Sequence, residues 1–255
     1  MKSITFSKAM VLAAPLAMLV AAQAANANLI LNGDFSSNAS SYNSDYGYDN
    51  TGQSGDTNPA NPTDWTLGTG GGTGINGTGT HIGTNANAFG PVHPTQLNDV
   101  GGVIADYAFA QNGGSLEQTF SVTAGTTYEI TYDAAARNQG TSLGTSTAPA
   151  GIIATVADPN STVIYKQTSN FTNDTQFYSN DNAGGTYFTT SVGNGLDFTA
   201  LTTGLATLTL ADYGSTSDHS ADFTDVSVVA TPEPAAMGLF GVGALGLLLV
   251  RRRKA

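Results

Sequence analysis

The stretch that decides the fold is Ser115–Val122, SLEQTFSV, which is followed by a turn at Ala124–Gly125 and by Tyr128–Asp133, YEITYD. In both segments apolar or long side chains occupy every second position, and charged or hydroxylated side chains occupy the positions between. Because successive side chains of a strand point to opposite faces, this alternation predicts two strands with one buried and one solvated face. The short turn between them predicts that they pair as a β-hairpin.

The surrounding sequence extends this pattern of short strands. No window of ten or more residues between the two ends of the chain carries a 3.6-residue apolar period, and the composition is rich in Thr and Gly. We therefore predict an all-β fold, a single antiparallel β-sandwich of the jelly-roll type over residues 28–230. Further strands are expected at Asn28–Asn32, Val103–Phe109, Ile152–Ala157, Thr162–Lys166, Thr186–Val192, Leu205–Leu210 and Thr224–Val229.

Residues 1–27 have the features of a secretory signal helix. Lys2 and Lys8 precede an apolar run over 9–22, and the small residues Ala25 and Ala27 fit an A-x-A cleavage site that leaves Asn28 first. The segment Ala22-Gln23-Ala24 is a second cleavage option, and an uncleaved anchor is the alternative to cleavage. The prediction is export through the Sec translocon.

The last 25 residues, 231–255, contain three parts in a fixed order. Pro232, Glu233 and Pro234 are followed by sixteen uncharged residues, 235–250, and then by Arg251, Arg252 and Arg253 with Lys254. Sixteen helical residues span roughly 24 Å, slightly less than a hydrocarbon core of about 30 Å. The basic cluster would hold its end in the cytoplasm, so a C-terminal transmembrane helix with the prolines outside is predicted.

This tripartite tail resembles the PEP-CTERM sorting signal, which exosortase systems of Gram-negative bacteria recognise. The resemblance implies that the tail is a processing and sorting segment, that exosortase is a partner, and that the membrane anchor is transient. An ordinary membrane anchor with a chance Pro-Glu-Pro is the alternative.

Composition excludes several functions. The chain has 255 residues, 19 acids and eight bases, and the two ends carry six of the bases and one acid, which leaves 18 acids against Arg137 and Lys166. So acidic a domain repels phosphate backbones, which excludes nucleic acid as a partner. No cysteine is present, so disulfides, thiolate metal sites and cysteine nucleophiles are excluded.

A second resemblance extends over most of residues 28–230. The opening Asn28–Phe35, the segment Pro62–Trp65, the segment Gly113–Phe120 with the turn after it, and the closing Asp225–Val228 are similar to galactose-binding-like jelly rolls. That family includes carbohydrate-binding modules and surface proteins. The resemblance places Trp65 in the core.

Catalytic motifs find no support in their context. Gly140–Gly144 matches G-x-S-x-G and Gly72–Gly77 matches G-x-G-x-x-G, but neither has the strand and helix that its chemistry requires. Glu117 and Glu129 are the only glutamates of the core, and both are expected on the solvated face of one hairpin, without the cleft that an acid catalyst needs. We therefore predict that the protein is not an enzyme and uses no cofactor.

Ligand sites are expected only in loops. Ser36–Asp64 and Gly68–Gly79 read as long loops, and the first carries Tyr42, Tyr46 and Tyr48 among Asn and Asp residues, a composition suited to stacking and hydrogen bonding with glycans. No metal site is predicted, because His81, His93 and His219 lack zinc spacing and the aspartates lack a calcium-loop pattern.

The jelly-roll resemblance also raises the question of a structural calcium between the first and last strands. The positions that carry acids in related proteins are the neutral Ser36 and Thr224 here. Strand alternation is expected to turn the neighbouring Asp34 and Asp225 away from that seam. No bound calcium is therefore predicted.

The sequence thus favours a non-enzymatic secreted protein of the cell surface or the exopolysaccharide matrix, as found in biofilms. The alternative is a carbohydrate-binding protein that recognises glycans through its loops.

Overall fold

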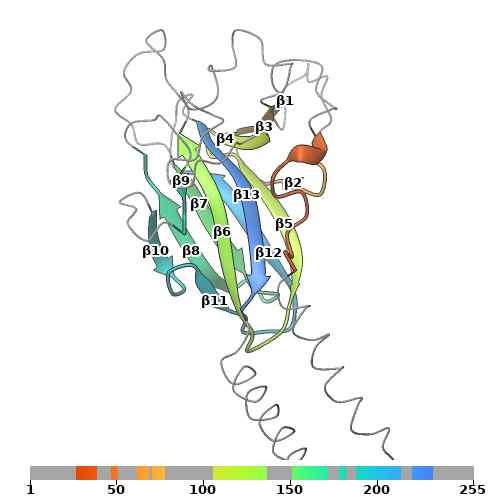
Figure 1. Ribbon diagram of the computed structural model, residues 1–255, viewed down its shortest axis with the longest axis vertical. Helices are drawn as coiled ribbons and strands as arrows, with labels where there is room; N and C mark the ends of the chain where they lie inside the picture. Colours follow the sequence, from red (N-terminus) through yellow and green to blue (C-terminus); the bar gives the residue numbers. More distant parts are fainter. Residues whose placement is uncertain are drawn as a thin grey trace, which may run out of the picture.

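Two antiparallel sheets pack face to face in the protein, as the computed structural model shows (Figure 1). The residues described are 27–38, 47–50, 62–68, 71–77, 106–136, 151–171, 178–181, 188–213 and 220–231. Within them the only helical element is one 3-10 turn, η1, at Ser36–Asn38. The all-β prediction is confirmed, whereas the expected signal helix and C-terminal helix lie outside the described residues.

One sheet has the strand order β1-β3-β4-β13-β6-β11, with β9 also beside β6. Its central strands are the longest of the chain, and both carry an apolar face toward the core. The strands of this first sheet are β1 (Gly47–Asn50), β3 (Gly72–Gly77), β4 (Asp106–Gln111), β6 (Thr127–Ala136), β9 (Tyr178–Ser179), β11 (Asp197–Thr199) and β13 (Ser220–Ala230).

The other sheet has the order β10-β8-β7-β12-β5-β2. Burial alternates along its central strands, so one face meets the core and the other carries mainly Thr and Ser toward solvent. The strands of this second sheet are β2 (Thr66–Leu67), β5 (Ser115–Val122), β7 (Ile152–Ala157), β8 (Val163–Ser169), β10 (Phe188–Val192) and β12 (Gly204–Asp212).

The predicted β5–β6 hairpin is wrong. β5 pairs with β12 and β2 in the second sheet, whereas β6 pairs with β13 and β11 in the first, and residues 123–126 cross between the sheets. Both strands do have the predicted alternation, because each turns its apolar face to the shared core. Alternation predicts which face is buried, but the pairing partner depends on non-local ladders such as the eight-residue register between β5 and β12.

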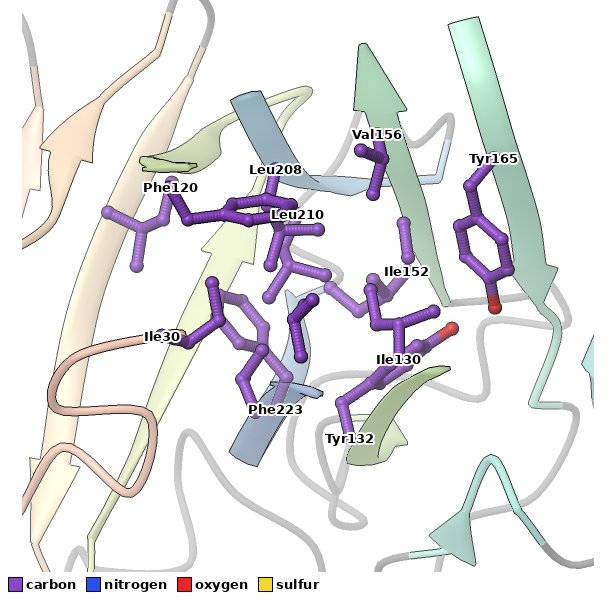
Figure 2. Packing of buried hydrophobic residues seen from close by; sticks show 14 of the residues in the cluster. Ile30, Phe120, Ile130, Tyr132, Ile152, Val156, Tyr165, Leu208, Leu210 and Phe223 are labelled. Atoms are coloured by element: carbon purple, nitrogen blue, oxygen red, sulfur yellow. The ribbon is translucent and has the colours of Figure 1, made fainter. Parts of the chain in front are cut away.

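Side chains from both sheets fill the space between them (Figure 2). Phe120, Leu208 and Val156 come from the second sheet, and they face Ile130 and Phe223 of the first. Trp65 is also buried, as the sequence predicted, and its indole Nε1 donates to the carbonyl of Asn32 at 3.1 Å.

A polar cluster is buried at the edge of this apolar core. The Tyr132 hydroxyl donates to Gln167 Oε1 at 2.8 Å, and the same oxygen accepts Asn180 Nδ2 at 3.0 Å. Asn180 Oδ1 in turn accepts the backbone N–H of Tyr132 at 2.9 Å. Burial raises the pKa of Tyr132 well above its ordinary value, so the hydroxyl remains a donor at neutral pH.

Two predicted loops contain strands. β1 lies within the expected loop Ser36–Asp64, and β3 covers the Gly-rich part of Gly68–Gly79, including the G-x-G-x-x-G match. Glycine has low strand propensity, but antiparallel pairing of β3 with both β1 and β4 compensates for it. The expected strand Asn28–Asn32 is instead an irregular segment, although it is hydrogen-bonded to β13.

Candidate functional site

A surface pocket of about 330 Å³ lies between the N-terminal segment and β13. We call it the seam pocket. It is rich in hydrogen-bonding groups, because two carboxamides, two carboxylates and one hydroxyl contribute to its lining. The lining residues are Asn28, Ile30, Asn32, Gly33, Asp34, Asp225, Val226 and Ser227.

The N-terminal segment runs antiparallel to the last part of β13. Leu29 N donates to Val228 O at 2.8 Å, and Val226 N donates to Gly33 O at 3.1 Å. The Asn28 side chain adds two bonds, because Nδ2 donates to Val226 O at 3.3 Å and Oδ1 accepts Val228 N at 3.0 Å. Among the described residues, Asn28 is the first that bonds to β13, and Ala27 before it is exposed.

A bulge in β13 forms the opposite wall of the pocket. The register with β6 shifts between Thr224 and Ser227, and Asp225 has a φ of 51°, in the left-handed region. Thr224 and Val226 are both buried, so Asp225 alone of these three side chains is exposed.

The carboxylates of Asp34 and Asp225 belong to the same pocket. Asp34 Oδ1 accepts Ser36 N at 3.2 Å and Ser36 Oγ at 3.0 Å. Although the Asp225 side chain is exposed overall, partial desolvation of its carboxyl group, and then the negative charge of Asp34, raise its pKa, while a hydrogen bond with Asp133 opposes that rise. The expectation that alternation separates Asp34 and Asp225 from the seam is therefore wrong, since the bulge and the turn bring both to it.

The pocket has the chemistry to bind hydroxyl groups, because carboxylates accept hydrogen bonds and carboxamides both donate and accept them. Within the described ranges, no three His, Cys, Asp or Glu side chains are grouped so that they would hold a metal ion. The prediction that no calcium binds at the seam stays a prediction.

The tyrosines predicted to bind glycans are only partly within the described residues. Tyr42 and Tyr46 lie outside them, and Tyr48 lies on β1, where its backbone position is opposite Gly74. In the same row across the first sheet, Gly74 pairs with Phe109, and Phe109 pairs with Asp222. Phe109 and Asp222 are fully buried although they lie on the face away from the core.

The two glutamates are not neighbours. Glu117 lies on β5 in the second sheet and Glu129 lies on β6 in the first, each on the outer face of its sheet. The hydrophobic core separates them, so they do not flank a common substrate. G-x-S-x-G at 140–144 and all three histidines lie outside the described residues.

Both ends of the domain leave the sandwich at the same end, which we call the exit end (Figure 1). β13 ends at Ala230, and the next residue, Thr231, donates from its N–H and its hydroxyl to Thr127 O at 2.9 and 3.1 Å. Asn28 lies beside Val228, three residues before Thr231. The sorting residues at 232–234 and 251–253, and Ala25, lie outside the described residues, within which no helix is long and apolar enough to cross a membrane.

The sequence signals for the seam pocket were too weak to find it. Asn32, Gly33 and Asp34 form a typical turn sequence, and Asp225 lies in an otherwise regular strand. A bulge that depends on contacts between the two ends of the domain leaves no local pattern.

One comparison with known proteins supports the sorting motif. The family described as PEP-CTERM protein-sorting motif matches residues 230–254, so the predicted sorting motif is confirmed. No curated protein matches the sequence.

Several solved structures are similar to parts of this chain at low identity and with TM-scores below 0.5. The chain is 18% identical to a protein of the study "CBM4 structure and function", covering 49% of this chain and 71% of that one, with a TM-score of 0.33. It is 10% identical to TmCBM61, whose structure was solved in complex with β-1,4-galactotriose. That match covers 80% of this chain and 99% of TmCBM61, with a TM-score of 0.32. It is also 10% identical to the enzymatically active domain of tailspike protein 4 of bacteriophage CBA120, covering 80% of this chain but only 21% of that one, with a TM-score of 0.38.

Proposed function

We propose that the protein is a non-enzymatic component of the cell surface or of the exopolysaccharide matrix of a Gram-negative bacterium, because residues 230–254 match the PEP-CTERM sorting motif. The Sec translocon exports it, the tail anchors it transiently, and exosortase processes the tail. The observation that carries this proposal is the position of the motif directly after the last strand of a folded β-sandwich.

The boundary between fold and tail supports processing. Residues up to Thr231 are tied to β6, and the match to the sorting motif continues from there to residue 254. The match overlaps the last residue of β13, and a proline at 232 cannot donate a further ladder hydrogen bond, so we expect strand pairing to end before Pro232. A protease that cuts at Pro232–Pro234 would therefore leave every strand of the sandwich intact.

Cell fractionation with intact-mass analysis tests this proposal. Mature protein should begin at Asn28, lack residues 235–255, and occur outside the inner membrane. The matched comparison is a chain in which Arg251, Arg252 and Arg253 are replaced by Gln, which should weaken retention of the C-terminal end in the cytoplasm and leave the tail uncut. Surface-located protein with an intact 235–250 segment would contradict processing.

A second candidate function is glycan binding, and the seam pocket is the observation that favours it. Its volume is near the lower limit of about 300 Å³ for small-molecule sites, and its lining offers the donors and acceptors that sugar hydroxyls need. Tyr42, Tyr46 and Tyr48 remain proposed stacking residues for a longer glycan.

A glycan array on the mature protein tests this candidate. Specific, saturable binding should weaken on Asn32→Ala or Asp34→Ala, because each removes a polar group from the pocket. Asp64→Ala is a suitable control, since Asp64 is an exposed acid outside the pocket lining. Binding that persists unchanged in both pocket variants would place the glycan elsewhere.

A further inference from the structure

The exit end of the sandwich carries exposed aliphatic side chains. Leu201 and Leu205 are 63% and 61% exposed, and Val163 is 43% exposed. All three lie where β12 and β8 begin, because Gly204 pairs with the last residue of β5 and Val163 pairs with the last residue of β7. We call these three side chains the apolar rim.

Local hydrogen bonds place this rim next to the tail. Thr127 accepts two hydrogen bonds from Thr231 and pairs on its other side with Thr199, two residues before Leu201. Ala200 also exchanges backbone hydrogen bonds with the turn between β5 and β6, since it accepts Gly125 N at 2.8 Å and donates to Thr126 O at 3.1 Å.

The loops at the exit end carry no exposed charge, although the domain as a whole is strongly acidic. The nearest partly exposed acids are Glu129 and Asp197, which pair two positions away from the Thr127–Thr199 pair. Among the described residues 123–126, 158–163, 199–205 and 231, Asp158 is the sole ionisable residue, and it is buried. Its carboxylate accepts the backbone N–H groups of Asn160 and Thr162, both at 2.9 Å, and the Thr202 hydroxyl at 3.2 Å. The exposed polar residues of this end are neutral hydroxyls and amides.

The tail is too short to hold the domain away from a membrane. Three residues, 232–234, separate Thr231 from the apolar segment that begins at Ala235. Four extended residue steps reach at most about 14 Å. The interfacial layer of a bilayer is itself about 5–8 Å thick, and charge interactions persist over about 8 Å at physiological salt, so the exit end would lie at the headgroups.

We propose that the exit end is a lipid-facing surface that rests on the membrane while the tail is inserted, with Leu201 and Leu205 in the headgroup region. This inference rests on the proposed sorting function. It accounts for the missing surface charge, because an acidic surface this close to anionic lipid would be repelled. The contact holds the Pro-Glu-Pro segment close to the membrane plane, where a membrane-embedded protease would cut it.

Site-specific fluorescence on the full chain tests the proposal. The chain has no cysteine, so Leu201→Cys can be labelled alone with an environment-sensitive dye. In phosphatidylcholine vesicles the emission should shift to shorter wavelength, and nitroxide-labelled lipid should quench most of it. The matched control is Tyr213→Cys, which is also surface-exposed but lies at the other end of β12, about 30 Å away at 3.3 Å per residue, and should show neither change.

A second variant separates contact with lipid from contact with a neighbouring protein. Leu201→Asp with Leu205→Asp should abolish lipid quenching of a label at Val163→Cys, while the melting temperature stays unchanged because both leucines are exposed. A blue shift at position 201 without lipid quenching would indicate a protein neighbour and overturn the proposal. The proposal would also be overturned if, in vesicle-bound protein, the labels at positions 201 and 213 showed the same emission shift and the same lipid quenching.

The outcomes distinguish this inference from the proposed function. If the full-length protein floats with vesicles but lipid does not quench the label at position 201, the lipid-facing surface is ruled out and the proposed sorting function is not. Quenching at 201 in a chain that cells never process contradicts exosortase sorting and supports the lipid contact. Chain that does not float with vesicles overturns both.

Discussion

At the scale of single residues, the position of Asp225 is expected to lower the stability of the folded domain when its carboxyl group is ionised. Its folded pKa lies above the ordinary 3.8, because burial and the charge of Asp34 both disfavour ionisation. Between the two pKa values the native state binds more protons than the unfolded chain. Stability therefore falls as pH rises through the folded pKa, and at neutral pH ionised Asp225 destabilises the domain.

We accordingly expect Asp225→Asn to raise the melting temperature at pH 7 and to have little effect below pH 4. Asn tolerates a left-handed φ as well as Asp does, so the bulge should persist. Thermal unfolding monitored by circular dichroism across this pH range measures the difference. A cation held between Asp34 and Asp225 would reverse the sign, because Asp225→Asn would then lower the melting temperature and a chelator would lower that of the wild type.

Gly33 is a second residue whose identity the structure explains. A Cβ at position 33 would lie 2.0 Å from the carbonyl oxygen of Val226, in the segment where Val226 N donates to Gly33 O. Gly33→Ala should therefore cost about 2–4 kcal/mol, from overpacking and the lost hydrogen bond.

Gly125→Ala is the matched comparison for Gly33→Ala. Gly125 has a φ of 81° but no neighbour within 4 Å of an added Cβ, so only backbone strain of about 1–2 kcal/mol is expected. Urea unfolding of both variants decides which effect is larger. An equal or smaller loss at position 33 would show that the N-terminal segment does not pack against β13 as described.

At the scale of secondary structure, the sequence predicted strands better than it predicted their partners. β5 and β7 have the predicted bounds, because alternation between a buried and a solvated face is a local signal. The pairing of β6 with β13 joins residues about a hundred positions apart, and no local pattern encodes it. The same limit hid the seam pocket, since Asp34 and Asp225 meet only because the N-terminal segment is hydrogen-bonded to β13, about 200 positions later in the chain.

The buried Tyr132–Gln167 pair links the two sheets and allows a sharper test of their packing. Tyr132→Phe should cost about 1 kcal/mol, because Gln167 Oε1 keeps its bond from Asn180. Gln167→Leu should cost about 2–3 kcal/mol, because it leaves the buried Tyr132 hydroxyl without that acceptor. The double variant should cost less than the sum, and a coupling near zero in urea unfolding would show that the two side chains do not interact.

At the scale of the whole molecule, hydrogen bonds place Asn28 and Thr231 near the same end of the sandwich, because both are tied to the strand ends of β13 and β6. The localisation proposed for the protein rests on the pattern of residues 1–27 and on the tail motif, which are contiguous sequence features. The common exit end was not predictable, since it depends on how Asn28 and Thr231 are tied to β13 and β6.

This arrangement predicts that the domain is complete at Thr231. Residues 28–231 should unfold at the same temperature as the processed protein and show far less helix in circular dichroism than the third or so typical of globular proteins, since all described regular elements except η1 are strands. Ending the chain at Val226 instead removes the Val228 bonds to Asn28 and Leu29 and four register pairs with β6, from Ser227 to Ala230, so this variant should be unfolded or melt far lower. Equal melting temperatures for the chains that end at Thr231 and at Val226 would contradict this prediction. They would show that residues 227–231 do not stabilise the sandwich.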